Sequence, residues 1–232
     1  MSPGRFQAGA THILYDPRWT ASVSLEWLHP EFWRLRGAVL RDLGGRGQAI
    51  VVETDAGRAV LRRYHRGGQA ARVSRDRYLF CGYSRSRGFR EWQVLERLRA
   101  VGLPVPRALM VSCERRGPTY RAGLLTALIP EAQTLHDAVD QLGDDDWRAL
   151  VETLRRFFAA GVVHADLNAS NVLRSGKQDW HLIDFDRARI RRAPVDPKPM
   201  IRRLQRSLLK HGKTEAAERL ASDFGLAVRG TG

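Results

Sequence analysis

Residues 161–173 read GVVHADLNASNVL, and they set a run of polar side chains between two apolar segments. The polar run begins at His164, includes the carboxylate of Asp166 and ends at Asn171. A surface loop does not need apolar flanks, and a core strand carries few polar side chains because each buried polar group needs a hydrogen-bonding partner. The pattern therefore predicts a loop that holds polar groups in place beside a buried core.

A second polar group follows a predicted strand. The apolar stretch WHLIDF, residues 180–185, brings Asp184 to a strand end, 13 residues beyond Asn171. We expect the two side chains to meet, and the oxygens of Asn171 and Asp184 are of the kind that Mg²⁺ prefers. Asp166 is then available to hold the proton of an attacking hydroxyl. Metal ligands beside a positioned base are what phosphoryl transfer requires.

Length and composition set the class of protein. The chain has 232 residues, of which 43% are hydrophobic, enough for one large domain or two small lobes. Its two cysteines, Cys81 and Cys113, do not make a disulfide framework or a zinc site; they suggest a reducing compartment, or are simply small buried side chains. No apolar run approaches the roughly 18 residues that span a bilayer, and the N-terminus lacks the apolar core of a signal peptide. We therefore expect a cytosolic protein, or one attached to a membrane from its cytosolic side.

The chain is strongly basic, with a formal net charge of +14. Such a charge favours an anionic partner, which could be nucleic acid, an acidic membrane or a phosphorylated substrate. A GC-rich genome that encodes Arg where others encode Lys would give the same balance. Charge alone does not choose among these explanations.

The order of predicted elements is strands, one helix, strands and then mostly helices, which is typical of an α+β fold with two lobes. We expect an N-lobe over residues 1–129 and a C-lobe over residues 130–232, hinged near Ile129 and Pro130. The strongest helix signal is in residues 144–161, where large apolar residues recur at i, i+3, i+4 and i+7. The other expected elements are a short helix at 29–37, three strands within 38–64, an irregular basic stretch at 65–87, a helix at 88–102, strands at 107–112, 120–129, 171–174 and 180–185, and a helix at 198–213.

Two motifs resemble those of the protein-kinase-like superfamily. HADLNASN, residues 164–171, resembles the H-R-D-L-x-x-x-N catalytic loop, and DFD, residues 184–186, resembles D-F-G. The resemblance implies that Asp166 is the catalytic base, that Asn171 is the second metal ligand and that Asp184 binds Mg²⁺. The alternative is that these three residues only cap turns and end a strand. The matching order and spacing of the motifs argue against it.

The phosphate-binding motifs upstream depart from the superfamily pattern. LGGRGQAIVV stands at the place of the Gly-rich loop, which would put Gly44, Gly45 and Gly47 near the phosphates, but a plain hairpin turn fits the stretch equally well. AVLRR stands at the place of V-A-I-K, so that Arg62 replaces the usual Lys and keeps its positive charge. The next residue, Arg63, would face the other side of the strand.

Glu91 is the natural ion-pair partner of Arg62. On the helix that follows Gly88, it shares a face with Leu95 and Leu98, so we expect it to point inward. A buried carboxylate is costly unless it is paired. The alternative is an exposed Glu91 at the edge of the apolar stripe.

The segment after Asp184 is short. Only 48 residues follow it, and they contain no A-P-E motif, which belongs to the region that holds a peptide in protein kinases. A small molecule or a glycolipid is therefore the expected acceptor.

Within the superfamily the chain resembles the 3-deoxy-D-manno-octulosonic acid (Kdo) kinases of lipopolysaccharide biosynthesis. The resemblance implies a protein-kinase-like fold with a β-rich N-lobe and a short helical C-lobe. It also implies transfer of the ATP γ-phosphate, with Mg²⁺, to a Kdo hydroxyl on a lipid A precursor at the cytoplasmic face of the inner membrane. The segments that carry it are GGRG, VLRRYHRGG, RDRYLF, FREWQVLERLRAVGLPVPRAL, LIPEAQTL, HADLNASNVL and LIDFDRARI.

The basic charge then has a use, because the Kdo–lipid A acceptor and the bilayer are both anionic. The arginines of residues 65–87 could bind sugars or head groups, and we expect no nucleic-acid partner. The helix at 198–213 has one apolar face, formed by Ile201, Leu204 and Leu208, which could lie on the membrane. We favour the alternative that this helix packs on the C-lobe with its basic face in solvent.

Two other functions fit the motifs. One is a kinase of another acceptor, such as a core heptose, an aminoglycoside or a protein. The other is a degenerate kinase fold that binds RNA or an anionic surface without catalysis. The retained Asp166, Asn171 and Asp184 argue against the second, while Arg62 in place of Lys argues weakly for it.

Overall fold

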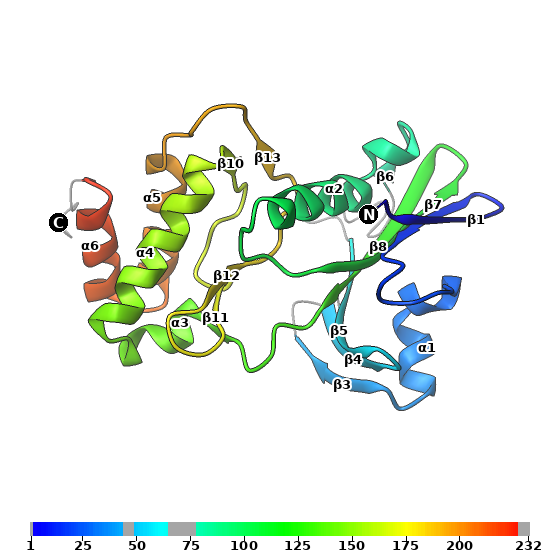
Figure 1. Ribbon diagram of the computed structural model, residues 1–232, viewed down its shortest axis with the longest axis horizontal. Coiled ribbons are helices and arrows are strands. Elements are labelled where there is room, and N and C mark those ends of the chain that lie inside the picture. Colours follow the sequence, from blue (N-terminus) through cyan, green and yellow to red (C-terminus); the bar gives the residue numbers. More distant parts are fainter. Residues whose placement is uncertain (1, 44–48, 65–77, 227–232) are drawn as a thin grey trace. The chain divides into compact units, whose positions relative to one another are not determined.

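The computed structural model describes residues 2–43, 49–64 and 78–226 (Figure 1). It forms two compact units, the first of Met1–Glu96 with Arg107–Leu128 and the second of Arg97–Pro106 with Ile129–Gly232. The expected division into an N-lobe and a C-lobe at residue 129 stays a prediction, and the observed grouping differs from it by placing Arg97–Pro106 with the second unit. Within the described ranges, no helix has the length and apolar content that crossing a membrane requires.

An eight-stranded antiparallel sheet forms the first unit. Along the sheet the order is β1-β2-β7-β8-β5-β4-β3, with β6 pairing with β8 as well. The three strands expected within 38–64 are present, and the turn between the last two comes at the Asp55–Ala56 pair, as the TDAG sequence predicts. The strands are β1 (Gly4–Ala8), β2 (Thr11–Tyr15), β3 (Val39–Asp42), β4 (Ala49–Thr54), β5 (Gly57–Arg63), β6 (Tyr78–Leu79), β7 (Ala108–Arg116) and β8 (Thr119–Ala127).

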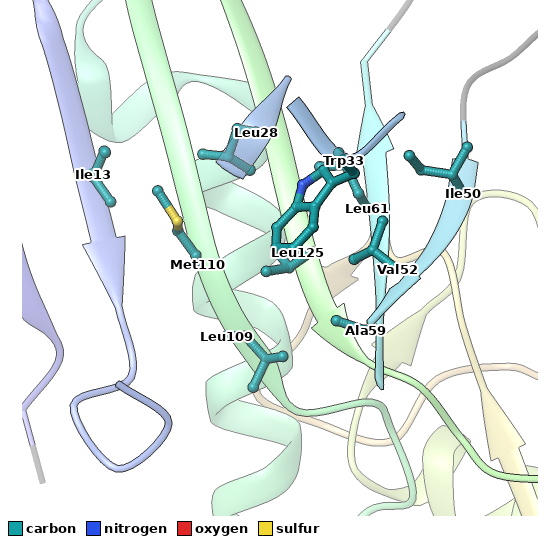
Figure 2. Close-up of a cluster of buried hydrophobic side chains, with 10 residues drawn as sticks. All are labelled: Ile13, Leu28, Trp33, Ile50, Val52, Ala59, Leu61, Leu109, Met110 and Leu125. Carbon is teal, nitrogen blue, oxygen red and sulfur yellow. The ribbon is translucent and has the colours of Figure 1, made fainter. Parts of the chain in front are cut away.

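One face of this sheet carries a hydrophobic cluster (Figure 2). The 3-10 helix η1 (Leu25–Leu28) and the helix α1 (Pro30–Leu35) lie over it and contribute Leu28 and Trp33. Trp33 also donates a hydrogen bond from Nε1 to the Trp27 carbonyl at 2.7 Å, so its polar atom is satisfied inside the cluster. The strand residues of the cluster are Ile13, Ile50, Val52, Ala59, Leu61, Leu109, Met110 and Leu125.

The helix α2 (Arg87–Ala100) packs on the other face. Gly88 lies so close to the sheet that an added Cβ would come within 2.8 Å of Val111 Cγ2. Leu95 and Leu98 are buried as their helical spacing predicts. The helix ends where Gly102 adopts a left-handed φ of +71°, a conformation that favours glycine.

The second unit is mainly helical, with two small antiparallel sheets of orders β10-β13 and β12-β11-β9. In α5 (Lys198–Lys210), Ile201, Leu204 and Leu208 are buried, which confirms that this helix packs on the protein rather than laying its apolar face on a membrane. The other elements are β9 (Gln133–Thr134), α3 (Leu135–Ala138), η4 (Val139–Gln141), α4 (Asp144–Ala159), β10 (Val162–Val163), β11 (Val172–Arg174), β12 (Trp180–Leu182), β13 (Arg189–Ile190) and α6 (Thr214–Asp223).

Two segments differ from expectation. The hairpin of β1 and β2 was not predicted, although Gly9 with its φ of +55° makes the turn and Ile13 is buried. Residues 78–87 are not irregular, because they form β6, the 3-10 helix η3 (Tyr83–Arg85) and the first residue of α2. Hydrogen bonding to the long strand β8 orders β6, and β8 lies far from β6 in the sequence.

Candidate active site

The loop that follows β10 begins with a buried histidine. His164 is 3% exposed, and its Nδ1 accepts a hydrogen bond from the Asp166 backbone N–H at 3.2 Å. The other ring nitrogen, Nε2, therefore carries the proton, and it donates a hydrogen bond to the Ile183 carbonyl at 3.0 Å. Burial lowers the pKa of His164, which keeps the ring neutral with this tautomer. His164 thus ties the loop to the residue just before Asp184.

Asp166 lies at the exposed side of the same loop. Its side chain is 58% exposed, Oδ2 accepts from Asn168 Nδ2 at 3.1 Å, and Oδ1 lies 3.4 Å from Arg203 Nη1. An ionised carboxylate has about four acceptor sites, so these two contacts leave room for a substrate hydroxyl. The arrangement gives a fixed carboxylate that solvent and substrate can reach.

Asn171 is held by its backbone and its amide. Its Nδ2 donates to the Asp166 carbonyl at 2.8 Å, and its backbone N–H is bonded to Asn168 Oδ1 at 3.1 Å. Its own carbonyl accepts from the Ile183 N–H at 3.0 Å, which links the loop to the residue before Asp184 a second time. With the amide nitrogen engaged, the oxygen Oδ1 is the atom of Asn171 that remains to bind a cation.

Asp184 follows β12 with a left-handed φ of +61°, a conformation that Asp tolerates better than most residues. The next side chain, Phe185, is 1% exposed, and its ring centroid lies 5.0 Å from that of His164. Burial of Phe185 fixes the backbone on both sides of the turn and so fixes the position of Asp184. The hydrogen bonds made by the Ile183 backbone place the chain next to Asp184 beside Asn171 and His164, and the meeting of the Asn171 and Asp184 side chains stays a prediction.

The donor set fits a magnesium ion of the kind that binds with a nucleotide. Among the described residues, no cluster of three His, Cys, Asp or Glu side chains is arranged to hold a metal by itself. Mg²⁺ bound through one or two protein oxygens, substrate phosphates and water does not need such a cluster. The amide oxygen of Asn171 and the carboxylate of Asp184 are hard oxygen donors suited to that role.

The first unit carries the remaining predicted residues. Arg62 Nη2 forms an ion pair with both oxygens of Glu91, and the Tyr64 hydroxyl donates to Glu91 Oε2 at 2.6 Å. Glu91 is 3% exposed and Arg62 is 23% exposed, so the predicted inward orientation and pairing of Glu91 are confirmed. The Arg62 guanidinium also lies 5.2 Å from the centre of the Tyr64 ring. The pair therefore fixes a guanidinium that still reaches solvent.

Two predicted elements lie outside the described residues. Gly44, Gly45 and Gly47 of the proposed phosphate loop fall in residues 44–48, and most of the basic stretch falls in residues 65–77. Of its described arginines, Arg87 donates to the Tyr78 hydroxyl at 2.6 Å, which gives it a role in the fold.

The sequence predicted no role in the site for Arg203, His164 or Asn168. Asn168 and His164 lie inside the motif, so their polar character was a signal that could have been used. Arg203 is one of several basic residues on α5, and nothing in the spacing separates it from Arg202 or Arg206. Only the fold places it beside Asp166.

Comparison with known proteins gives the family. Residues 30–222 match the model of the lipopolysaccharide kinase (Kdo/WaaP) family. A 3-deoxy-D-manno-octulosonic acid kinase of Xanthomonas euvesicatoria pv. vesicatoria (strain 85-10) is 39% identical over 228 residues, 97% of this chain and 90% of the relative. A protein of the same name from Stenotrophomonas maltophilia (strain R551-3) is 36% identical over 226 residues, again 97% and 90%. The α+β fold and the family resemblance expected from the sequence are both confirmed, and the chain belongs to the lipopolysaccharide kinase (Kdo/WaaP) family.

Proposed function

We propose that the chain is an ATP-dependent Kdo kinase, which transfers the γ-phosphate of ATP to a hydroxyl of Kdo on a lipid A precursor. The observation that carries the proposal is the loop around Asp166, where an accessible carboxylate, an amide oxygen and Asp184 are held by one network of hydrogen bonds. The names of the relatives supply the substrate. Neither the loop around Asp166 nor the names of the relatives favours the two alternatives, a kinase of another acceptor or a binding protein without catalysis.

Asp166 acts as the base. The acceptor hydroxyl oxygen bonds to the γ-phosphorus as the hydroxyl proton passes to the Asp166 carboxylate. The bond between the γ-phosphorus and the bridging oxygen breaks, and ADP leaves with its electron pair. Asn168 orients the carboxylate through its hydrogen bond to Oδ2. Arg203 places a positive charge 3.4 Å from Oδ1 and so helps to hold the carboxylate in position.

Asn171 and Asp184 would hold Mg²⁺, which supplies charge neutralisation for the phosphate oxygens. The chain's contribution is to fix these two ligands. The Asp166 carbonyl holds the amide of Asn171, and the buried Phe185 and the bonds of Ile183 hold the turn at Asp184. Preorganised ligands lower the cost of ordering the site in each turnover.

In the first unit, Arg62 would contact phosphate oxygens of ATP, as Lys does in related kinases. Glu91 and Tyr64 hold the guanidinium from one side. The forked geometry of a guanidinium matches phosphate oxygens, which supports Arg62 in this role. Gly44, Gly45 and Gly47 would provide backbone contacts to the same phosphates.

The acceptor would be bound by basic residues, at a peripheral position on the cytoplasmic side of the inner membrane. The net charge of +14 supports attraction to an anionic glycolipid and bilayer. Contact of the acceptor with the stretch at 65–87, in particular with Arg75 and Arg77, stays a prediction. The exposed basic side chains of α5, including Arg203, are a second candidate surface.

The test is incubation of the purified protein with Mg-ATP and Kdo–lipid A, followed by mass spectrometry. We expect the glycolipid to gain the mass of one phosphate, and the Asp166→Asn variant to produce far less of this product. A core heptose acceptor, an aminoglycoside and a generic protein substrate serve as parallel acceptors. Phosphorylation of one of these in place of Kdo–lipid A would refute the proposed substrate, and absence of any ATP turnover would refute the proposed activity.

A further inference from the structure

A pocket beside α1 is lined by described residues that have no part in the proposed reaction. It is formed by side chains of the segment from Trp19 to Ala38 and by the end of the β4–β5 hairpin, and its volume is about 410 Å³. The Glu53 N–H donates to the Ala38 carbonyl at 2.9 Å, which joins the hairpin to the end of that segment. All of these residues belong to the first unit. The volume lies in the range of roughly 300–1,000 Å³ that is usual for pockets of small molecules.

Four aromatic rings form much of the pocket lining. Trp19 and Trp27 meet edge to face, with ring centroids 5.4 Å apart and planes at 73°, so together they form a corner. Phe32 and Trp33 meet in the same way at 5.1 Å and 90°. Trp33 is buried in the cluster of Figure 2, whereas the other three rings are partly exposed. A ligand that stacks on them gains apolar contact at little cost in conformational entropy, because the rings are already packed against the cluster.

The pocket also carries charges of both signs. Glu53 and Asp55 come from the hairpin, and Arg36 comes from the C-terminal end of α1. The Arg36 guanidinium lies over the Phe32 ring, 4.6 Å from its centroid, in a contact that does not use its N–H donors. Glu53 forms an exposed ion pair with Arg58 at 3.3 Å, which leaves acceptor capacity on its carboxylate. The pocket therefore offers hydrogen-bond donors and acceptors beside its aromatic rings.

A buried N–H gives independent evidence for a ligand. The Nε1 atom of Trp19 is buried, and it has no hydrogen-bonding partner among the residues that the structure describes. An indole N–H is a donor only, and it usually finds an acceptor when it is buried. Trp33 does so, because its Nε1 donates to the Trp27 carbonyl at 2.7 Å. Trp19 lines the pocket, and a small rotation of its ring about the soft χ2 torsion would turn the N–H toward an acceptor there.

The mixed character of the lining discriminates among classes of ligand. A purely apolar ligand, such as an acyl chain, would leave Arg36, Asp55 and the Trp19 N–H without matching partners. A cation would be repelled by Arg36, and a phosphate or carboxylate by Glu53 and Asp55. A neutral sugar has C–H faces that can stack on aromatic rings. Its hydroxyls can donate to carboxylates and accept from N–H groups.

We propose that this pocket binds a neutral sugar unit, either of a free saccharide or of a glycolipid. The sugar ring stacks on Trp27, its hydroxyls donate to Asp55 and Glu53, and one of its oxygens accepts from Trp19 Nε1. Arg36 supplies further donors at the edge of the pocket. The inference does not rest on the proposed kinase reaction, because none of these residues takes part in it.

Saturation-transfer NMR on the full chain tests the proposal. The probes are the methyl glycosides of glucose, galactose, mannose and N-acetylglucosamine. Mg²⁺ and a non-hydrolysable ATP analogue are present throughout, so that the nucleotide site is filled. We expect transfer from the protein to the C–H protons of at least one glycoside, and saturable binding with a Kd in about the millimolar range, which is ordinary for a ligand of this size.

Two variants test the lining, and a third is the matched control. Trp19→Phe keeps an aromatic ring but removes the N–H donor, and it should weaken binding about two- to tenfold. Asp55→Asn removes a charged acceptor from the exposed hairpin turn and should weaken binding about threefold to tenfold. Arg34→Gln should leave binding unchanged, because Arg34 lies on α1 as well but pairs with Glu31 outside the pocket. Circular dichroism establishes that each variant is folded.

The same variants identify the source of the sugar unit. The methyl glycosides represent soluble saccharides, and sedimentation with phosphatidylcholine vesicles, with or without a glucosyl diacylglycerol, represents glycolipids. Weaker binding of either probe in Trp19→Phe or Asp55→Asn, with Arg34→Gln unchanged, supports the site and names its source. The proposal is overturned if no probe binds the wild type, if both pocket variants bind as the wild type does, or if Arg34→Gln weakens binding as much as they do. Kinase activity is measured separately, so failure of this site leaves the proposed reaction untouched.

Discussion

Replacing Arg62 by Met should destabilise the protein strongly, because it removes a cation that pairs with the buried Glu91 carboxylate. Glu91 is 3% exposed, and its two oxygens are bound by Arg62 Nη2 and by the Tyr64 hydroxyl. Removing one partner of a buried ion pair costs about 3–5 kcal/mol. Arg62 is 23% exposed, and Tyr64 remains in the variant, so we expect the lower end, about 3 kcal/mol.

The assay is urea unfolding followed by circular dichroism, with a thermal scan as a second measure. For a chain of this size, about 3 kcal/mol corresponds to a fall in Tm of roughly 6–12 °C. Arg62→Lys is the informative comparison. A single nitrogen of Arg62 contacts both carboxylate oxygens, so an ammonium group can replace it, and we expect a loss of about 1 kcal/mol or less. Tyr64→Phe removes a hydrogen bond to the charged Glu91 carboxylate and should cost about 1.5–3 kcal/mol.

The refuting result is a small effect of Arg62→Met. If it lowers the free energy of unfolding by less than about 0.5 kcal/mol, the range of a surface substitution, then the pair is not holding a buried charge. A large and equal loss in Arg62→Lys would also contradict the reasoning, because it would mean that the shape of the guanidinium matters more than its charge.

The other predictions concern the catalytic loop and one buried carboxylate. Asp166→Asn should lower kcat by roughly 10²–10⁴-fold with nucleotide binding nearly intact, since it removes a general base, and near-normal turnover in steady-state kinetics would contradict this. Asp184→Asn, which tolerates the left-handed backbone that Ala would strain, should abolish Mg²⁺-dependent nucleotide binding in calorimetry, and unchanged affinity would contradict it. Arg203→Met should lower kcat/KM by about threefold to tenfold at low salt and less at high salt, because the contact to Asp166 is exposed, while the matched Arg206→Met should have little effect. Burial raises the pKa of Asp16, but hydrogen bonds from Arg18 and Arg107 outweigh this effect and hold the pKa well below its usual range. Ionised Asp16 therefore contributes its full share to the stability of the fold above the unfolded-state pKa of about 4, and this contribution is lost as the pH falls further. Asp16→Asn should remove this loss of stability at acid pH in unfolding titrations.

Local patterns in the sequence were enough for most of the fold. The i, i+3, i+4 spacing in residues 144–161 and the TDAG turn each describe neighbours in the chain, and both elements form as expected. Asp166, Asn171 and Asp184 were predicted as site residues because their motif spacing is short and fixed. Each of these signals depends on residues that lie close together in the chain.

Features that depend on distant contacts were missed. Asp16 is buried, and its carboxylate accepts hydrogen bonds from Arg18 and from Arg107, which is 91 residues away. No local pattern therefore indicates that this carboxylate lies inside the first unit. The short strand β6 forms because β8 pairs with it, not because its two residues favour a strand.

The helix α5 shows why the motif alone does not complete the site. Its buried face holds the catalytic loop at two points, since Met200 Sδ accepts from the His164 N–H at 3.3 Å and Ser207 Oγ accepts from the Ala169 N–H at 3.0 Å. At a third point Arg203, on the exposed face, meets Asp166. The same amphipathic pattern that suggested a membrane helix therefore serves to position the proposed base, because the apolar face is used inside the protein. The basic face remains exposed and could bind an anionic acceptor, and Arg203 on that face contacts Asp166, the proposed base.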